Sequence, residues 1–172
     1  MKNTLLILFL FFAGIASAQE TFTDDVNGLS YTYPESWHKD QNSTGTYYVT
    51  NDTAYFLAQA DRFFKDFEYD AQNINDSAYR EDLLNKMILS TGRDVTILEY
   101  GNMNVSGLPA YFIVWNIAGK DNNPQTGSKM IQIQTAVKEM FYTFNAGAPI
   151  KFYTDYKSIF DSIIASISIK KR

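Results

Sequence analysis

The sequence predicts an α+β fold: a largely antiparallel β-sheet of about six or seven strands flanked by helices, in an α/β/α sandwich. Runs of alternating apolar and polar residues, typical of strands, fill the first and third quarters of the chain that follows residue 18. One helical pattern lies midway and another ends the chain. Because strands and helices do not alternate, a parallel sheet of βαβ units is disfavoured.

The first eighteen residues predict export. Lys2 supplies a positive start, Leu5 to Phe12 is an unbroken apolar run, and Ala16-Ser17-Ala18 is a small-residue cleavage site. The run is shorter than the roughly 20 residues that span a bilayer, and no second run follows, so we expect no transmembrane segment after cleavage. We therefore predict a signal peptide over residues 1–18, cleavage after Ala18, a periplasmic or secreted protein, and one domain over residues 19–172.

The first strands of this domain follow from alternation and turn residues. Leu29 to Tyr33 alternates with period two and ends at Pro34. Tyr47 to Thr50 and Ala54 to Ala60 are rich in aromatic, β-branched or other apolar residues, and Asn51-Asp52 separates them, which predicts a hairpin.

Apolar residues then recur at three- and four-residue spacing from Asp76 to Ser90, which predicts an amphipathic helix that ends at Gly92. The strand pattern returns in four segments: Val95 to Tyr100, Ala110 to Ile117, Met130 to Val137 and Met140 to Asn145. A long loop, Gly119 to Ser128, joins two of them. Asp155 to Ser166 carries one apolar stripe and predicts a terminal helix packed on the sheet.

Composition excludes several kinds of chemistry. The chain has no cysteine, which excludes disulfides, thiol catalysis, cysteine-ligated zinc and a lipoprotein anchor. After residue 18 it carries 14 Lys and Arg against 19 Asp and Glu, a net charge of −5, so we expect no nucleic-acid partner and no generic attraction to an anionic membrane face. The basic end Lys170-Lys171-Arg172 is expected to be a solvated tail or to lie at the end of the last helix, and a docking patch is the alternative.

The chain offers little to a catalytic or metal site. Ser36 and Lys39 fit the S-x-x-K spacing, but no S-D-N or K-T-G follows. His38 is the only histidine, which excludes a multi-histidine metal centre. We therefore expect no catalytic residues, no metal site and no cofactor, and we expect Trp37 to lie in the core.

The most unusual stretch is Asp61 to Asp70, in which four aromatic residues crowd into seven positions. Aromatic side chains left exposed would form an apolar patch of the kind that marks a partner surface. The candidate partner-binding residues are Phe63, Phe64, Phe67 and Tyr69. The alternative is that these rings pack beneath the mid-chain helix.

The order of motifs resembles that of the PsbP-like proteins, whose fold is shared with the Ran-binding factor Mog. The segment Leu29 to Trp37 matches a strand, a proline, two residues and a tryptophan. Gly107 to Ala110 precedes an aromatic strand, Tyr142-Thr143-Phe144 ends a hairpin, and Tyr153 to Ile167 is similar to the closing helix. The resemblance implies an antiparallel sheet between helices and a mostly non-enzymatic family, and this chain most resembles its uncharacterised exported bacterial members.

Three functions remain open. The first is an exported, non-catalytic module that binds another protein or an envelope component through a loop-lined end of its sheet or the 61–70 segment. The second is a small-molecule or lipid carrier with a cavity of at least about 300 Å³ lined by residues such as Trp115, Phe144 and Phe160. The third is a hydrolase that uses Ser36 or His38.

Overall fold

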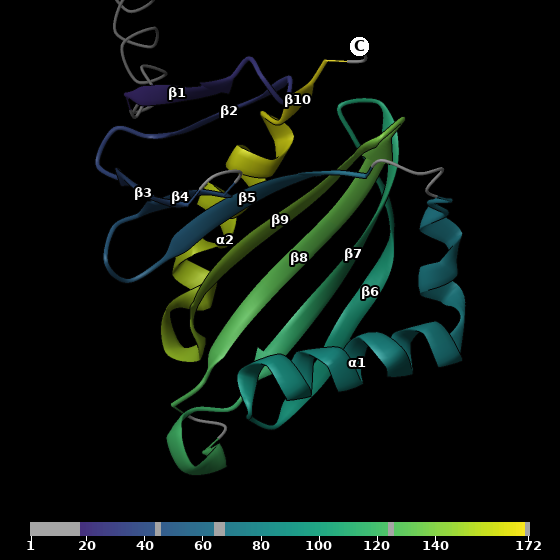
Figure 1. Ribbon diagram of the computed structural model, residues 1–172. Helices are drawn as coiled ribbons and strands as arrows, with labels where there is room; N and C mark the ends of the chain where they lie inside the picture. The colour runs from purple at the N-terminus through teal and green to yellow at the C-terminus, as the bar shows by residue number, and fades with distance from the viewer. Residues whose placement is uncertain (1–17, 44–45, 64–67, 124–125, 171–172) are drawn as a thin grey trace, which may run out of the picture.

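The computed structural model describes residues 18–43, 46–63, 68–123 and 126–170. They form an antiparallel seven-stranded sheet in the order β3-β4-β5-β9-β8-β7-β6, and a three-stranded sheet in the order β1-β2-β10 (Figure 1). The strands are β1 (Gln19–Asp24), β2 (Leu29–Pro34), β3 (His38–Ser43), β4 (Thr46–Thr50), β5 (Tyr55–Arg62), β6 (Val95–Val105), β7 (Leu108–Ile117), β8 (Ser128–Val137), β9 (Met140–Pro149) and β10 (Ser168–Ile169). The helices are η2 (Ala71–Asn75), α1 (Ser77–Thr91), η3 (Lys120–Asn122) and α2 (Ile150–Ala165).

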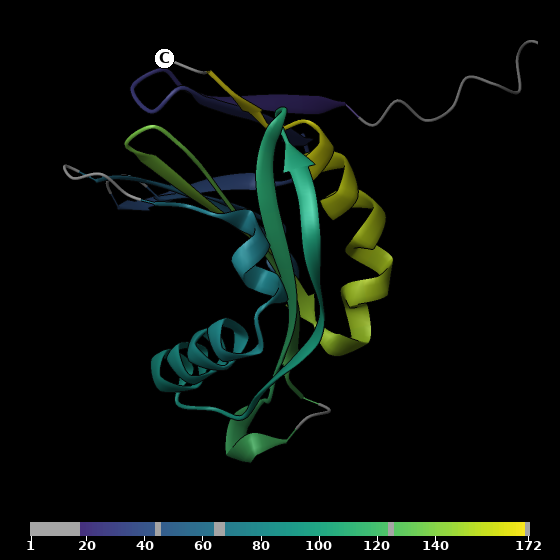
Figure 2. The same cartoon turned by 90° about the vertical axis from the view of Figure 1, so that its right-hand side faces the viewer.

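The two long helices lie on opposite faces of the large sheet. Figure 2 views the sheet from its side, with α2 against one face and α1 on the other. The small sheet shares the α2 face, because α2 contacts β2 as well as β8 and β9. The predicted sandwich of helices around an antiparallel sheet is therefore confirmed.

The α2 face holds the larger core. The alternation read in β2 places Leu29, Tyr31 and Tyr33 inward, where each is 1% exposed. They meet the apolar stripe of α2, including Phe160 and Ile163, in one cluster with residues of the large sheet. Burial of this much apolar and aromatic surface is the main stabilising term of the fold.

The α1 face is less completely covered. A smaller cluster contains Tyr111, Ile113 and Trp115 of β7, and α1 packs on it. Asp76 caps α1 by accepting from the backbone N–H of Ala78, and Gly92 ends it in the left-handed conformation with φ 63°. No residue of α1 is fully buried, so this helix lies on the sheet as a partly exposed cover.

Several boundaries differ from the sequence prediction. Strands β1, β3 and β10 were not predicted, because β1 and β3 are mostly polar segments with little apolar alternation, and β10 has two residues that pair with the distant strand β2. Strand β6 extends to Val105, although its edge position leaves most of its side chains exposed. Helix α2 begins at Ile150, directly after Pro149 and five residues before the predicted start.

Candidate functional site

The candidate site is the end of the molecule where the β1–β2 turn, the end of β5, the β8–β9 turn and the C-terminal end of β10 meet. We call it the loop-lined end, and it comprises residues 24–28, 61–63, 137–142 and 170. Pairing of β5 and β8 with β9 brings two of these segments together, and pairing of β10 with β2 brings together the other two. The Tyr142 hydroxyl, which donates to the Asn27 carbonyl, joins the two groups. They lie near the top of the view in Figure 1.

Of the two candidate partner-binding residues that the structure describes, Phe63 is the more exposed. It follows β5, its backbone N–H donates to the Glu139 carbonyl at 2.8 Å, and its ring meets Phe141 edge to face with centroids 6.1 Å apart. The side chain is nevertheless 38% exposed. The backbone position of Phe63 is thus fixed while part of its ring faces water.

Tyr69 has a different environment. Its hydroxyl donates to the Gln134 carbonyl at 2.6 Å, and its ring stacks on Tyr111 with centroids 6.1 Å apart. Burial raises the pKa of Tyr69 above its ordinary value. Tyr69 therefore packs on the sheet, and Phe64 and Phe67 lie outside the described residues.

The loop-lined end contains a hollow of about 240 Å³. Its walls come from all four segments, and they are Val26, Asn27, Arg62, Val137, Lys138, Glu139, Met140, Tyr142 and Lys170. Exposed cations therefore lie beside apolar side chains in one concave surface.

Asp24 holds one wall of this hollow in place. Its carboxylate accepts from the backbone N–H groups of Val26 and Asn27 at 2.9 and 3.1 Å, and from the Tyr47 hydroxyl at 2.7 Å. The side-chain amide of Asn27 adds a bond at 2.6 Å. Burial would raise the pKa of Asp24, but these hydrogen bonds to the ionised form outweigh it and the pKa is lowered.

Further contacts join the β1–β2 turn to its neighbours. The Tyr142 hydroxyl donates to the Asn27 carbonyl at 2.7 Å. The backbone N–H of Lys170 donates to the Gly28 carbonyl at 2.8 Å, and its ammonium pairs with Asp25 at 3.1 Å. The hollow is thus formed by backbone segments that are already hydrogen-bonded to one another.

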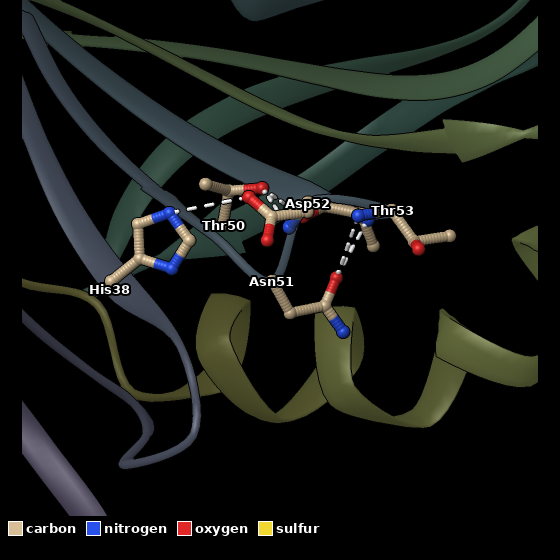
Figure 3. Close-up of polar contacts among 6 residues, drawn as sticks. His38, Thr50, Asn51, Asp52 and Thr53 are labelled. Carbon is tan, nitrogen blue, oxygen red and sulfur yellow. Dashed lines mark hydrogen bonds and ion pairs between the residues drawn. The ribbon is translucent and has the colours of Figure 1, made fainter.

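The residues considered for a hydrolase lie apart from this end. His38 starts β3, and its Nε2 lies 3.4 Å from a carboxylate oxygen of Asp52 in the β4–β5 turn (Figure 3). Both side chains are largely exposed. In the same turn the Thr50 hydroxyl donates to the Ala54 carbonyl and accepts from the Asp52 N–H.

Ser36 lines a different surface, a groove of about 270 Å³ between β2 and α2. Trp37, between Ser36 and His38, is buried against Tyr156 and Phe160 as predicted. Within the described ranges, no group of three or more metal-ligating side chains lies together. In the described residues, His38 therefore has Asp52 as an acidic neighbour, whereas Ser36 lines a separate groove that does not include His38.

The residues expected to line a carrier cavity lie on two different faces of the large sheet. Trp115 belongs to the α1-side cluster, whereas Phe144 and Phe160 lie in the α2-side core. A groove of about 260 Å³ does lie between α2 and strands β6 to β8, with Phe160 in its wall. Its apolar floor is formed by Met103, Phe112, Val114 and Ile131.

Sequence reasoning located Phe63 but missed the charged residues around it. Arg62, Lys138 and Lys170 are far apart in the chain and meet only through strand pairing. A local signal existed only for Lys170, in the basic C-terminal run. Its side chain is exposed, as expected of a solvated tail, but its backbone N–H donates to the Gly28 carbonyl, and Lys171 and Arg172 lie outside the described residues.

Comparison with solved structures supports the fold assignment. The chain is similar to cyanobacterial PsbP (CyanoP) from Synechocystis sp. PCC 6803, with a TM-score of 0.68, 16% identity, and coverage of 92% of this chain and 96% of that chain. It is similar to LpqN, involved in cell envelope biogenesis of Mycobacterium tuberculosis, with a TM-score of 0.60, 9% identity, and coverage of 92% and 87%. A structure from Bacteroides thetaiotaomicron matches with a TM-score of 0.55, 12% identity, and coverage of 89% of this chain and 49% of that one. At these identities the likeness concerns the fold alone.

The family of the chain follows from a comparison with protein-family models. No protein with a curated description matches the sequence. None of the described helices has the length and apolar character needed to cross a membrane. The PsbP family model matches residues 17–169, which is nearly the whole chain and agrees with the order of motifs in the sequence. The chain belongs to the PsbP family.

Proposed function

We propose that this protein is an exported, non-catalytic accessory module that binds another protein or an envelope component through its loop-lined end. The observation that carries the proposal is the exposed Phe63 ring beside a preformed hollow. Val26, at the tip of the β1–β2 turn in the wall of the hollow, is 76% exposed. Apolar side chains held in water next to a concave surface are typical of interaction sites.

The comparisons support the envelope part of this proposal. LpqN shares the fold and is described as involved in cell envelope biogenesis. The first strand, β1, begins at Gln19, directly after the predicted cleavage site. A signal peptide over residues 1–18 would therefore leave every described strand and helix intact and deliver the domain to the periplasm or outside the cell.

A crosslinking pull-down from the native envelope fraction tests the proposal. Phe63→Ser is compared with Phe152→Ser, because Phe152 is equally exposed at 37% but lies on α2, away from the loop-lined end. Both variants are first checked for an unchanged melting temperature. We expect a reproducible captured component with the wild type and Phe152→Ser and its loss with Phe63→Ser. Equal capture by both variants would contradict the proposal.

A second candidate function is supported by the groove between α2 and strands β6 to β8. Its floor is apolar, and its walls carry Lys129 and Lys157 together with Glu99 and Asp161, of which Asp161 pairs with Lys157 at 2.7 Å. A small, largely apolar molecule would suit such a groove, although its volume of about 260 Å³ is smaller than we expected for a carrier.

Native mass spectrometry of the protein purified from its own host tests this carrier function. We expect a bound small molecule in the wild type and its absence after Met103→Glu, which places a charge in the apolar floor. A protein that carries no adduct, or one that keeps its adduct after this substitution, would contradict the carrier function.

A further inference from the structure

Three cations from distant parts of the chain line the hollow of the loop-lined end. Arg62 ends β5, Lys138 lies in the β8–β9 turn, and Lys170 follows β10. All three are exposed. This concentration of positive charge occurs in a chain whose net charge is −4.

The loop-lined end also carries four carboxylates, of which Asp61 accepts from the Gln59 side chain and does not line the hollow. Asp25 pairs with Lys170, and Glu139 is the single acidic residue in the wall of the hollow. Asp24 is buried and directs its carboxylate to Val26, Asn27 and Tyr47. Neither Arg62 nor Lys138 forms an ion pair with another of the described residues, so the charged groups of both remain available to a ligand.

The backbone that carries these cations is held before any ligand binds. The N–H of Phe63, next to Arg62, donates to the carbonyl of Glu139, next to Lys138, at 2.8 Å. Lys138 itself has a φ of 53°, in the tight turn between the paired residues Val137 and Met140. A site on such a fixed frame loses little entropy when it orders around a ligand.

The arrangement of charges favours a phosphate group over a carboxylate. A phosphate monoester carries about −1.5 to −2 charges and three acceptor oxygens, so it can engage cations from several sides. The planar guanidinium of an arginine can bind two of these oxygens at once. The hollow, at about 240 Å³, has room for a headgroup-sized ligand.

We propose that the loop-lined end binds a phosphate group through Arg62, Lys138 and Lys170. The group belongs either to a small soluble phosphate ester or to a lipid headgroup. This inference deepens the proposed function, since it names the chemistry recognised at the same surface. If the phosphate belongs to a lipid headgroup, the exposed Val26 and Phe63 side chains could insert into the membrane interface.

The test is a nuclear magnetic resonance titration of residues 19–172 with inorganic phosphate and with glycerol 3-phosphate. Sodium chloride of matched ionic strength serves as the reference. We expect saturable shifts of the amides around Arg62, Lys138 and Lys170 with the phosphates and none with chloride. Sedimentation with phosphatidylglycerol vesicles, against phosphatidylcholine vesicles, forms the second arm.

Charge variants distinguish a site from general electrostatic attraction. Arg62→Gln and Lys138→Gln should each weaken binding about two- to fivefold, as expected for exposed charge pairs. Glu139→Gln removes the acidic group and should strengthen it, by about twofold. Lys86→Gln is the matched control, because Lys86 is an exposed cation on α1 and should leave binding unchanged.

Each outcome decides the proposal. Saturable binding of the soluble phosphates assigns a soluble ester, and binding only to phosphatidylglycerol vesicles assigns a lipid headgroup. Absence of both, or binding that Arg62→Gln and Lys86→Gln affect equally, overturns the phosphate site. Capture that depends on Phe63 but accompanies no phosphate binding would leave the proposed function standing and reject this inference alone.

Discussion

Two phenylalanines illustrate how differently the protein uses its interior and its loop-lined end. Phe160 of α2 is 1% exposed and surrounded by Trp37, Tyr153 and Tyr156, whereas Phe63 is 38% exposed and has Phe141 as its ring neighbour. The first residue holds a helix on the sheet, and the second leaves part of its ring in water beside a hollow. Stability and recognition should therefore be separable by substitution.

The largest effect is expected from Phe160→Ala. Removing a buried aromatic ring leaves a cavity in the α2-side core, which should lower the free energy of unfolding by about 3 to 5 kcal/mol. Chemical denaturation monitored by tryptophan fluorescence measures this loss. A loss below about 1 kcal/mol would mean that α2 contributes far less to the core than its burial indicates.

Asp24→Asn should have the next largest effect, and the effect should depend on pH. Hydrogen bonds to a charged acceptor are worth about 1.5 to 3 kcal/mol, and the variant loses the charge that these donors stabilise. Because the pKa of Asp24 is lowered in the folded state, its contribution is present above the ordinary aspartate range and lost as the pH falls through the folded-state pKa.

Denaturation of the wild type and Asp24→Asn at several pH values measures this dependence. We expect the difference between their free energies of unfolding to shrink on acidification. A difference that stays constant from neutral to strongly acidic pH would argue against an ionised Asp24 as the group that holds the turn.

Leu84→Ala tests the other face of the sheet. Leu84 packs on the α1-side cluster but is only partly buried, so its truncation should cost about 1 kcal/mol. The measurement is the same denaturation experiment, made beside Phe160→Ala. Equal losses from the two substitutions would show that α1 is as firmly held as α2.

The smallest effect on stability is expected at the loop-lined end. Arg62→Gln changes an exposed side chain without an ion pair among the described residues, so the free energy of unfolding should change by less than about 0.5 kcal/mol. Thermal unfolding measures it. A larger loss of unfolding free energy would mean that Arg62 stabilises the fold. The Arg62→Gln variant would then be a poor probe of binding.

Much of the fold could be predicted because the responsible patterns are local. Alternation in Leu29 to Tyr33, the Asp76 cap and Gly92 each act within a few residues. The two-residue strand β10 is defined by a partner distant in sequence, β2, and strand β3 is a polar segment that pairs with β4. Their own residues carry too little periodicity to reveal them.

The candidate site was less predictable for the same reason. The density of aromatic residues near Phe63 is visible in the sequence, but whether a ring is exposed depends on its neighbours in space, and Tyr69 packs on Tyr111. The joining of Arg62 to Lys138 follows from the register of β5 with β9, in which Arg62 pairs with Met140. No pattern within either segment encodes that pairing.

The central claim is that the loop-lined end is the surface that meets a partner in the cell. Its most direct test is in-cell photocrosslinking with p-benzoylphenylalanine placed at position 63 or, as the matched control, at position 152. We expect a specific covalent adduct from position 63 and none from position 152. Adducts from position 152 alone, or identical adducts from both positions, would contradict the claim.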